Sequence, residues 1–456
     1  MKKFLTNLLP VFIALSVIAG GCNKPAQKSE NTPVSSVEQL EWSKNSSIYE
    51  INVRQYSEEG TIEAVRKDLP RIREMGVRIL WLMPIHPIGE KNRKGPLGSY
   101  YSVQDYKDVN PNFGTKADFA RFVDEAHQLG FKVIIDWVAN HTAWDNPWTE
   151  NPDWYELNEE GNFMPPRGTD WSDVIQLDYE NEEMRAAMID ALEYWVREFD
   201  IDGYRCDVAG MVPTDFWKEA IDSLNTIKPV FMLAEDGEPE LVKEAFHMNY
   251  AWQYAHTIRE IAKGHQTFQH LDSLMQVTEA NYPSSVYRMY FTSNHDENSW
   301  NGTDPGMYGD NFENFAVLSA TIDGMPLIYN GQESGLDKQL EFFEKDPIEW
   351  KEYEYQDFYT TLVGLKRDTP ALWNGDFGGD LEFIQIPEGS EGVLAYKRQK
   401  DDSEVVVVMN FSGDRQSVPL QDVGVDESYT TYNSTSLMVT SEEISFGPNQ
   451  WVIFVK

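Results

Sequence analysis

Three carboxylates follow short apolar segments spaced along the middle of the chain. Asp207 lies in GYRCDVAG, Glu235 in VFMLAED and Asp296 in FTSNHDEN. Each segment has the length and apolar content of a buried parallel strand, and the carboxyl ends of parallel strands meet at one rim of a sheet. Two carboxylates that meet there can cleave a glycosidic bond, one as nucleophile and the other as acid and base. The sequence therefore predicts a site for glycoside cleavage.

The surroundings of two of these acids suggest different roles. Arg205 and Asp207 are two residues apart on one strand, so both face the same side while Cys206 faces the helices. A guanidinium beside a carboxylate lowers its pKa, which suits Asp207 to be a nucleophile. Glu235 follows the apolar Phe-Met-Leu-Ala, and partial desolvation near other acids raises a carboxyl pKa, as a general acid requires. Taken singly, an Arg-Asp pair at a strand end is more typical of a structural salt bridge, but together the three acids favour a site.

The elements that must position these residues alternate regularly from Ser47 onward. Eight strand candidates are separated by amphipathic helical patterns, which predicts an α/β fold, a (β/α)8 TIM barrel over residues 42–373. The strand candidates cover residues 47–57, 78–88, 132–141, 201–210, 230–236, 248–256, 288–298 and 326–334.

Two further units are expected beside the barrel. The long, polar connection after the third strand, residues 142–176, predicts a short inserted domain, because loops of that size are usually functional. After Trp373 the pattern changes to short alternating segments such as GVLAYKR and EVVVVMNF, which predicts a C-terminal antiparallel β-sandwich over residues 374–456.

Composition excludes some partners. The chain has 456 residues with 75 acidic and 38 basic side chains, a formal net charge of −37. Such a charge repels phosphate backbones, so nucleic acid is not expected as a partner. An uncharged substrate is unaffected by that sign.

The N-terminus resembles a bacterial lipoprotein signal. Met-Lys-Lys is followed by an apolar stretch, Phe4 to Ile18, and by the small residues that precede Cys22. We expect residues 1–22 to be a signal peptide with its lipidation cysteine and residues 23–41 to be a flexible tether. The protein would then be exported and membrane-tethered, on a periplasmic or cell-surface face. An ordinary secretory signal cut nearby is the alternative.

Four ordered motifs carry a specific resemblance. They are Asp136-Trp-Val-Ala-Asn140-His141, Gly203-Tyr-Arg205-Cys-Asp207-Val-Ala209, Ala234-Glu235 and Asn294-His295-Asp296. In order and strand-end placement they are similar to the motifs of the alpha-amylase family of glycoside hydrolases, glycoside hydrolase family 13. The resemblance covers residue 42 to the C-terminus and implies a retaining alpha-glucan hydrolase that cleaves alpha-1,4 bonds of starch, glycogen or malto-oligosaccharides.

The same resemblance implies roles for individual residues. Asp207 would be the nucleophile, Glu235 the acid and base, and Asp296 the carboxylate that grips sugar hydroxyls. Their partners would be Arg205, which orients Asp207, His141 and His295, which hydrogen-bond the sugar, and Tyr101, which stacks on it. Double displacement then requires the carboxyl groups of residues 207 and 235 to lie roughly 5–5.5 Å apart.

Departures from the family pattern leave alternatives open. Gly210 and Met211 replace a lysine and a histidine often found after the nucleophile, which puts specificity on the leaving-group side in doubt. A transglycosylase, or an alpha-1,6-cleaving or alpha-glucosidase relative, would use the same carboxylates. A non-catalytic surface glycan-binding protein is the third reading. The tryptophans of the inserted loop, at positions 144, 148, 154 and 171, suit either packing or sugar stacking.

No cofactor is required for this chemistry. By resemblance, Asn140 and also Glu180 could supply oxygen ligands to a structural calcium, although an Asn at a strand end more often satisfies loop backbone. The cysteines and histidines lack zinc spacing, and no glycine-rich phosphate loop follows a strand.

Overall fold

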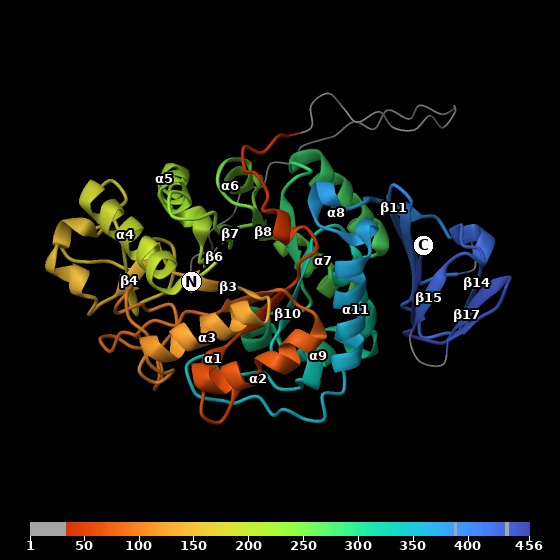
Figure 1. The fold of residues 1–456 in the computed structure, drawn as a ribbon, viewed down its shortest axis with the longest axis horizontal. Coiled ribbons are helices and arrows are strands. Elements are labelled where there is room, and N and C mark those ends of the chain that lie inside the picture. The colour runs from red at the N-terminus through yellow and green to blue at the C-terminus, as the bar shows by residue number, and fades with distance from the viewer. Residues whose placement is uncertain (1–32, 387–389, 434–436) are drawn as a thin grey trace, which may run out of the picture.

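The computed structural model describes residues 33–386, 390–433 and 437–456, and its centre is a closed parallel barrel (Figure 1). The strands follow the order β1-β10-β9-β8-β7-β6-β3-β2 around the barrel, which confirms the predicted (β/α)8 architecture. Their bounds are β1 (Ile48–Ile51), β2 (Ile79–Leu82), β3 (Lys132–Trp137), β6 (Gly203–Cys206), β7 (Phe231–Ala234), β8 (Met248–Tyr250), β9 (Tyr287–Tyr290) and β10 (Met325–Tyr329).

Alternate residues of these strands face two separate cores. Trp81, Leu233 and Met289 belong to the cluster inside the barrel, while Leu80 and Cys206 belong to the larger cluster between barrel and helices. The period of two along a strand explains this division. The prediction that Cys206 faces the helices is therefore confirmed.

The helices form an outer layer around the strands. The first predicted strand, 47–57, is shorter than expected, because the Asn52 side chain accepts a hydrogen bond from the Gln55 N–H and residues 53–56 turn into a helix instead. The helices are α1 (Val53–Tyr56), α2 (Ile62–Met75), α3 (Lys116–Gln128), α4 (Glu182–Phe199), α5 (Thr214–Asn225), α6 (Pro239–Glu244), α7 (Trp252–Ala262), α8 (Phe268–Asn281), α9 (Asp304–Tyr308), α10 (Phe312–Thr321) and α11 (Gln356–Asp368).

The segment after β3 leaves the barrel and returns as a small antiparallel pair. Strands β4 (His141–Ala143) and β5 (Val174–Gln176) enclose the excursion predicted for residues 142–176. Their register places His141 opposite Gln176. This pairing closes the loop directly above the β3 rim.

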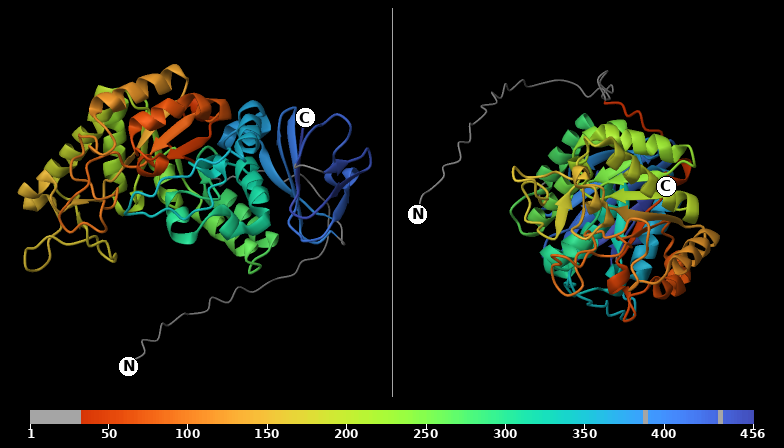
Figure 2. Two further views of the ribbon diagram at one scale, coloured as in Figure 1. Left: turned by 90° about the horizontal axis from the view of Figure 1, so that it is seen from below. Right: turned by 90° about the vertical axis from the view of Figure 1, so that its left-hand side faces the viewer.

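Two antiparallel sheets form the C-terminal unit, at one end of the molecule in Figure 2. Val406 and Val408 of one sheet share an apolar cluster with Ile444 and Phe446 of the other, as in a sandwich. The first sheet contains β11 (Asp380–Ile384), β12 (Val393–Lys400), β13 (Ser403–Asn410), β18 (Trp451–Val455) and β15 (Thr430–Asn433), and the second contains β14 (Gln416–Pro419), β17 (Glu443–Phe446) and β16 (Met438–Val439).

The sandwich is joined to the barrel by buried polar contacts. Arg398 of β12 donates through Nη1 to the carbonyl oxygens of Ile322 and Leu372, each at 3.2 Å. Asn314 Nδ2 of α10 donates to the Asn410 carbonyl oxygen at 2.9 Å. Because buried donors are costly to leave unpaired, these bonds hold the two units in one arrangement.

The predicted signal peptide, Cys22 and most of the predicted tether lie outside the described residues. Residues 33–41, the end of the tether as predicted, lie against the barrel. The Ser36 N–H donates to the Lys243 carbonyl oxygen at 2.9 Å and Gln39 Nε2 donates to that of His247 at 2.9 Å. Within the described ranges, no helix is long and apolar enough to cross a membrane.

Candidate active site

One buried arginine joins the ends of three neighbouring strands. Arg205 of β6 lies opposite Asp136 of β3 and Leu233 of β7. Its Nη1 donates to Asp136 Oδ1 at 2.8 Å and to Asp207 Oδ1 at 3.1 Å, while Nη2 lies 3.0 Å from Glu235 Oε2. The guanidinium therefore brings the predicted nucleophile and the predicted acid to the same place on the rim.

The backbone after Asp207 holds the second carboxylate. Val208 has φ 36° and ψ 47°, a left-handed conformation that is unfavourable for a β-branched residue. In this conformation its N–H donates to Glu235 Oε2 at 2.8 Å, and the Ala209 N–H donates to the Glu235 carbonyl oxygen at 3.2 Å. The strained turn thus fixes Glu235 relative to Asp207.

The pKa of Asp207 differs from the expected direction. Burial raises it well above the usual range, the charge of Glu235 raises it further, and the nearby Arg205 only partly opposes these effects. The lowered pKa predicted from the Arg205 contact is therefore wrong. The charge of Glu235, which contacts the same guanidinium, is thus part of the reason why the pKa of Asp207 is raised.

His295 lies at the centre of a second chain of contacts. Its Nδ1 lies 2.5 Å from Glu50 Oε1, and its Nε2 lies 2.7 Å from the Tyr101 hydroxyl and 3.2 Å from Asp296 Oδ2. Burial lowers the pKa of His295, but Asp296 and Glu50 outweigh burial and raise it to about 9. His295 is consequently a cation at neutral pH.

Tyr101 links this chain to the arginine cluster. Its hydroxyl donates to Asp136 Oδ2 at 3.1 Å, and its ring stacks on Phe342 with centroids 6.3 Å apart and planes 12° apart. These two contacts hold the tyrosine in one orientation at the wall of the site.

The pKa of Asp136, the acceptor of the tyrosine hydroxyl, is raised by burial to about 6, although Arg205 opposes the effect.

His141 is a neutral group of the same wall. Burial lowers its pKa to about 4, and its ring lies 5.5 Å from that of Trp171, between centroids. Its Nδ1 is 3.1 Å from Asn140 Nδ2. A neutral imidazole can donate one hydrogen bond and accept another, which suits contact with sugar hydroxyls.

A cavity of about 490 Å³ opens above these groups. All of the predicted site residues line it except Arg205, which is fully buried behind the carboxylates. Its aromatic walls come from Trp171, Trp300, Phe342 and Phe343. The full lining is Lys94, Ser99, Tyr101, His141, Asp170, Trp171, Asp173, Val174, Asp207, Val208, Glu235, His295, Asp296, Trp300, Phe342 and Phe343.

The loop tryptophans divide between the two interpretations. Trp171 lines the cavity, whereas Trp148 and Trp154 pack on each other with ring centroids 5.4 Å apart. Trp144 donates its indole N–H to the Ser172 carbonyl oxygen at 3.0 Å. Of these four tryptophans, Trp171 is the one that lines this cavity.

Sequence reasoning assigned no role to three residues that organise the site. Glu50 interrupts the apolar strand β1 and points into the barrel, a signal that could have been noticed. Asp136 stands in the first motif. Tyr250, whose hydroxyl accepts from Arg205 Nε at 3.0 Å, lies in an apolar segment and has no sequence signal.

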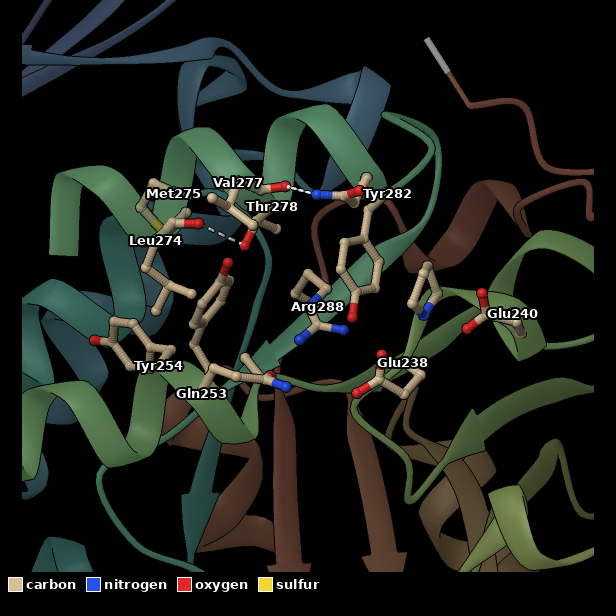
Figure 3. Close-up of a pocket in the computed structure, with 14 residues that line it drawn as sticks. Glu238, Glu240, Gln253, Tyr254, Leu274, Met275, Val277, Thr278, Tyr282 and Arg288 are labelled. Carbon is tan, nitrogen blue, oxygen red and sulfur yellow. Dashed lines mark hydrogen bonds between the residues drawn. The ribbon is translucent and has the colours of Figure 1, made fainter. Parts of the chain in front are cut away.

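A second cavity, of about 350 Å³, lies between α7, α8 and the start of α6 and contains none of the predicted catalytic carboxylates (Figure 3). Figure 3 shows Arg288 between Tyr282 and Gln253. The guanidinium lies 4.1 Å from the centroid of the Tyr282 ring and donates to Asn249 Oδ1 at 2.5 Å. The carboxylates needed for glycoside cleavage are in the other cavity.

The two residues predicted as possible calcium ligands have different surroundings in the structure. Asn140 Oδ1 accepts a hydrogen bond from Gln176 Nε2 at 3.0 Å, and Glu180 is exposed. Within the described part of the chain, no group of three or more His, Cys, Asp or Glu side chains could hold a metal ion. Calcium prefers six to eight oxygen ligands, and Asn140 Oδ1 already has the Gln176 amide N–H as its partner.

The sequence matches family models and known proteins. A family model described as the alpha amylase catalytic domain matches residues 38–374, and the alpha-amylase SusG C-terminal domain matches residues 393–453. Alpha-amylase MalA of Haloarcula japonica is 28% identical over 89% of this chain, and the maltogenic alpha-amylase of Bacillus acidopullulyticus is 27% identical over 79%. The chain spans 60% and 64% of the length of these two relatives.

Solved structures agree with these matches. An alpha-amylase from Lactobacillus plantarum is 32% identical with a TM-score of 0.79, covering 90% of this chain and 99% of its own. The maltogenic alpha-amylase AmyB of Thermotoga neapolitana is 31% identical with a TM-score of 0.78, covering 90% and 98%. Both similarities include the barrel and the C-terminal sheets.

Proposed function

Because the chain belongs to the alpha-amylase family and is a glycoside hydrolase, we propose that it cleaves alpha-1,4-glucosidic bonds of starch, glycogen or malto-oligosaccharides with retention of configuration. The observation that carries this proposal is the contact of one guanidinium, that of Arg205, with both Asp207 and Glu235 at the wall of one cavity.

The two carboxyl groups take different roles in the two steps of double displacement. Glu235 donates a proton to the glycosidic oxygen while the Asp207 carboxylate attacks the anomeric carbon, so that the bond to the leaving sugar breaks and a glycosyl ester forms. Glu235, now ionised, takes a proton from water, which attacks the anomeric carbon and releases Asp207. The Val208 N–H stabilises the ionised form of Glu235 between the two steps.

The remaining groups of the cavity contact the sugar in different ways. Asp296 lines the cavity beside His295. Its carboxylate can accept hydrogen bonds from sugar hydroxyls, and its negative charge stabilises the positive charge that develops on the sugar ring. The cationic His295 and neutral His141 supply N–H donors to hydroxyl oxygens. Trp171 and Phe342 offer apolar faces to the sugar rings.

The length of the preferred glucan depends on the leaving-group side. Met211, which stands where the family often has a histidine, is 42% exposed, and its thioether carries no charge, so this position offers no charged contact. The relatives include proteins named alpha-amylase, maltogenic amylase and cyclomaltodextrinase, so linear and cyclic alpha-glucans are both candidate substrates.

Time-resolved proton NMR of maltotriose cleavage tests the proposal. Retention predicts that the alpha anomer of the new reducing end appears first and then mutarotates. A first-formed beta anomer would contradict double displacement. Products longer than maltotriose would show that transglycosylation is the main reaction.

We also propose that the enzyme is exported and tethered to a membrane through a lipid on Cys22. The basic start, the apolar stretch and the small residues before Cys22 support this proposal. Labelled palmitate should enter the full chain expressed in a bacterial host and should not enter a Cys22→Ser variant. Equal labelling of both would overturn it.

A further inference from the structure

The side-chain amide of Gln176 lies among three oxygen atoms. Its Nε2 is 3.1 Å from the Asn140 carbonyl oxygen, 3.0 Å from Asn140 Oδ1 and 3.2 Å from the Leu177 carbonyl oxygen. Asn140 is fully buried and Gln176 is nearly so. A buried cluster of amide and carbonyl oxygens is the kind of surrounding that a hard cation such as Ca²⁺ prefers.

An amide nitrogen can take the place of a cation in such a cluster. Its two N–H groups carry partial positive charge and can be shared among the three oxygen acceptors. Satisfying buried carbonyl groups in this way avoids the cost of leaving them unpaired. We propose that the Gln176 amide replaces a structural metal at the base of the inserted loop, so that this chain holds the loop without calcium.

The same amide controls a residue of the active site. Asn140 Oδ1 accepts from Gln176, so Asn140 Nδ2 is the group that faces His141 Nδ1 at 3.1 Å. A ring nitrogen that accepts a hydrogen bond is unprotonated, and the neutral imidazole of His141 then carries its proton on Nε2. Gln176 is therefore a positioning residue that acts through Asn140 on the tautomer of a cavity-lining histidine.

Backbone pairing strengthens this coupling. Gln176 of β5 lies directly opposite His141 of β4, and the Leu177 N–H donates to the Asn140 carbonyl oxygen at 3.2 Å. The amide network and the two-stranded pair therefore close the same junction between the barrel and the inserted loop. A disturbance of Gln176 is expected to affect both loop stability and the orientation of His141.

The first test measures the thermal unfolding of the full chain with EDTA and with CaCl₂. Occupation of a calcium site well above its Kd raises Tm by several degrees. We expect a Tm that is the same in both solutions, and no calcium binding by isothermal titration calorimetry. A lower Tm in EDTA that CaCl₂ restores, with a stoichiometric binding isotherm, would overturn the proposal.

The second test converts the amide to a carboxylate. Gln176→Glu removes the two N–H donors and adds an oxygen, so its Tm in EDTA should fall by several degrees and CaCl₂ should restore part of the loss. The exposed Gln269→Glu on α8 adds the same charge and should unfold like the parent in both solutions. If Gln176→Glu unfolds like the parent in EDTA, the amide does not hold the loop.

The third test separates positioning from general stability, and its activity arm rests on the proposed function. In the parent, the ¹⁵N NMR signals of His141, assigned with a His141→Gln variant, should show the proton on Nε2. In Gln176→Ala, at a temperature where the variant remains folded, we expect a mixture of the two His141 tautomers. We also expect a roughly tenfold lower kcat/KM, which corresponds to the loss of about one hydrogen bond. An unchanged tautomer would contradict the coupling, even if the protein proved inactive on alpha-glucans.

Discussion

Replacing Glu50 by Gln should shift the alkaline limit of activity downward. Glu50 Oε1 lies 2.5 Å from His295 Nδ1, and both side chains are buried. Asp296 and Glu50 together overcome burial to raise the pKa of His295 to about 9. The substitution keeps the size and shape of the side chain but removes its negative charge, so His295 should lose its proton at a lower pH.

The size of the shift follows from the energy of one charge-assisted hydrogen bond. Such a bond contributes roughly 1.5–3 kcal/mol, and one pKa unit corresponds to about 1.4 kcal/mol. The pKa of His295 should therefore fall by about one to two units from its value of about 9. Because the contact that we propose between His295 and the sugar uses its cationic form, kcat/KM should decline at a pH about one to two units lower, with little change below about pH 6.5.

The free energy of unfolding should depend on pH through the same histidine. A histidine whose folded pKa is raised stabilises the fold fully below the unfolded pKa of about 6.5, and this contribution is lost as pH rises through the folded value of about 9. In Glu50→Gln the loss should be complete at a lower pH. Denaturant unfolding between pH 6 and pH 10 measures it.

The assay is a pH profile of kcat/KM on maltotriose, combined with an NMR titration of His295. Glu279→Gln on the exposed face of α8 removes one carboxylate far from the ring and should leave the profile unchanged. An unchanged alkaline limb and an unchanged titration in Glu50→Gln would mean that Glu50 is protonated in the resting enzyme, and the reasoning would be refuted.

Three further substitutions test separate parts of the site. Glu235→Gln should lower kcat on maltotriose by about 10²–10⁴-fold because it removes the acid, but should slow the single-turnover release of fluoride from maltosyl fluoride far less, because fluoride departs without an acid; equal losses in these two measurements would deny Glu235 that role. Trp171→Ala should raise KM on maltotriose about tenfold with kcat less affected, since stacking contributes about 1 kcal/mol, and an unchanged KM would exclude Trp171 from binding. Tyr250→Phe, which leaves Arg205 Nε without its acceptor, should lower the free energy of unfolding by about 1–3 kcal/mol in denaturant titration, and an unaltered midpoint would show that this bond is not needed.

The barrel and its rim could be predicted because they depend on short-range patterns. Asp207 and Glu235 each follow an apolar segment of strand length, and the topology of a parallel barrel brings such strand ends together whatever the loops do. The facing of Arg205 and Cys206 to opposite sides follows from the period of two along a strand.

What could not be predicted depends on the enclosure of each group in three dimensions. The rise in the pKa of Asp207 comes from burial and from Glu235, neither of which adjacency to Arg205 reveals. The contact of Tyr250 with Arg205 and that of Gln176 with Asn140 each join residues far apart in sequence. Pattern alone therefore located the candidate site but not the contacts that tune it.

Mass spectrometry of a trapped glycosyl-enzyme tests the central claim most directly. The Glu235→Gln variant, incubated with maltosyl fluoride and digested after quenching, should form the ester because fluoride departs without an acid and should hydrolyse it slowly because the base is missing. We predict one added maltosyl unit on the peptide that contains Asp207 and none in Asp207→Asn/Glu235→Gln. An adduct on the peptide that contains Asp296, or release of product from the double variant at the rate of the single one, would contradict the account.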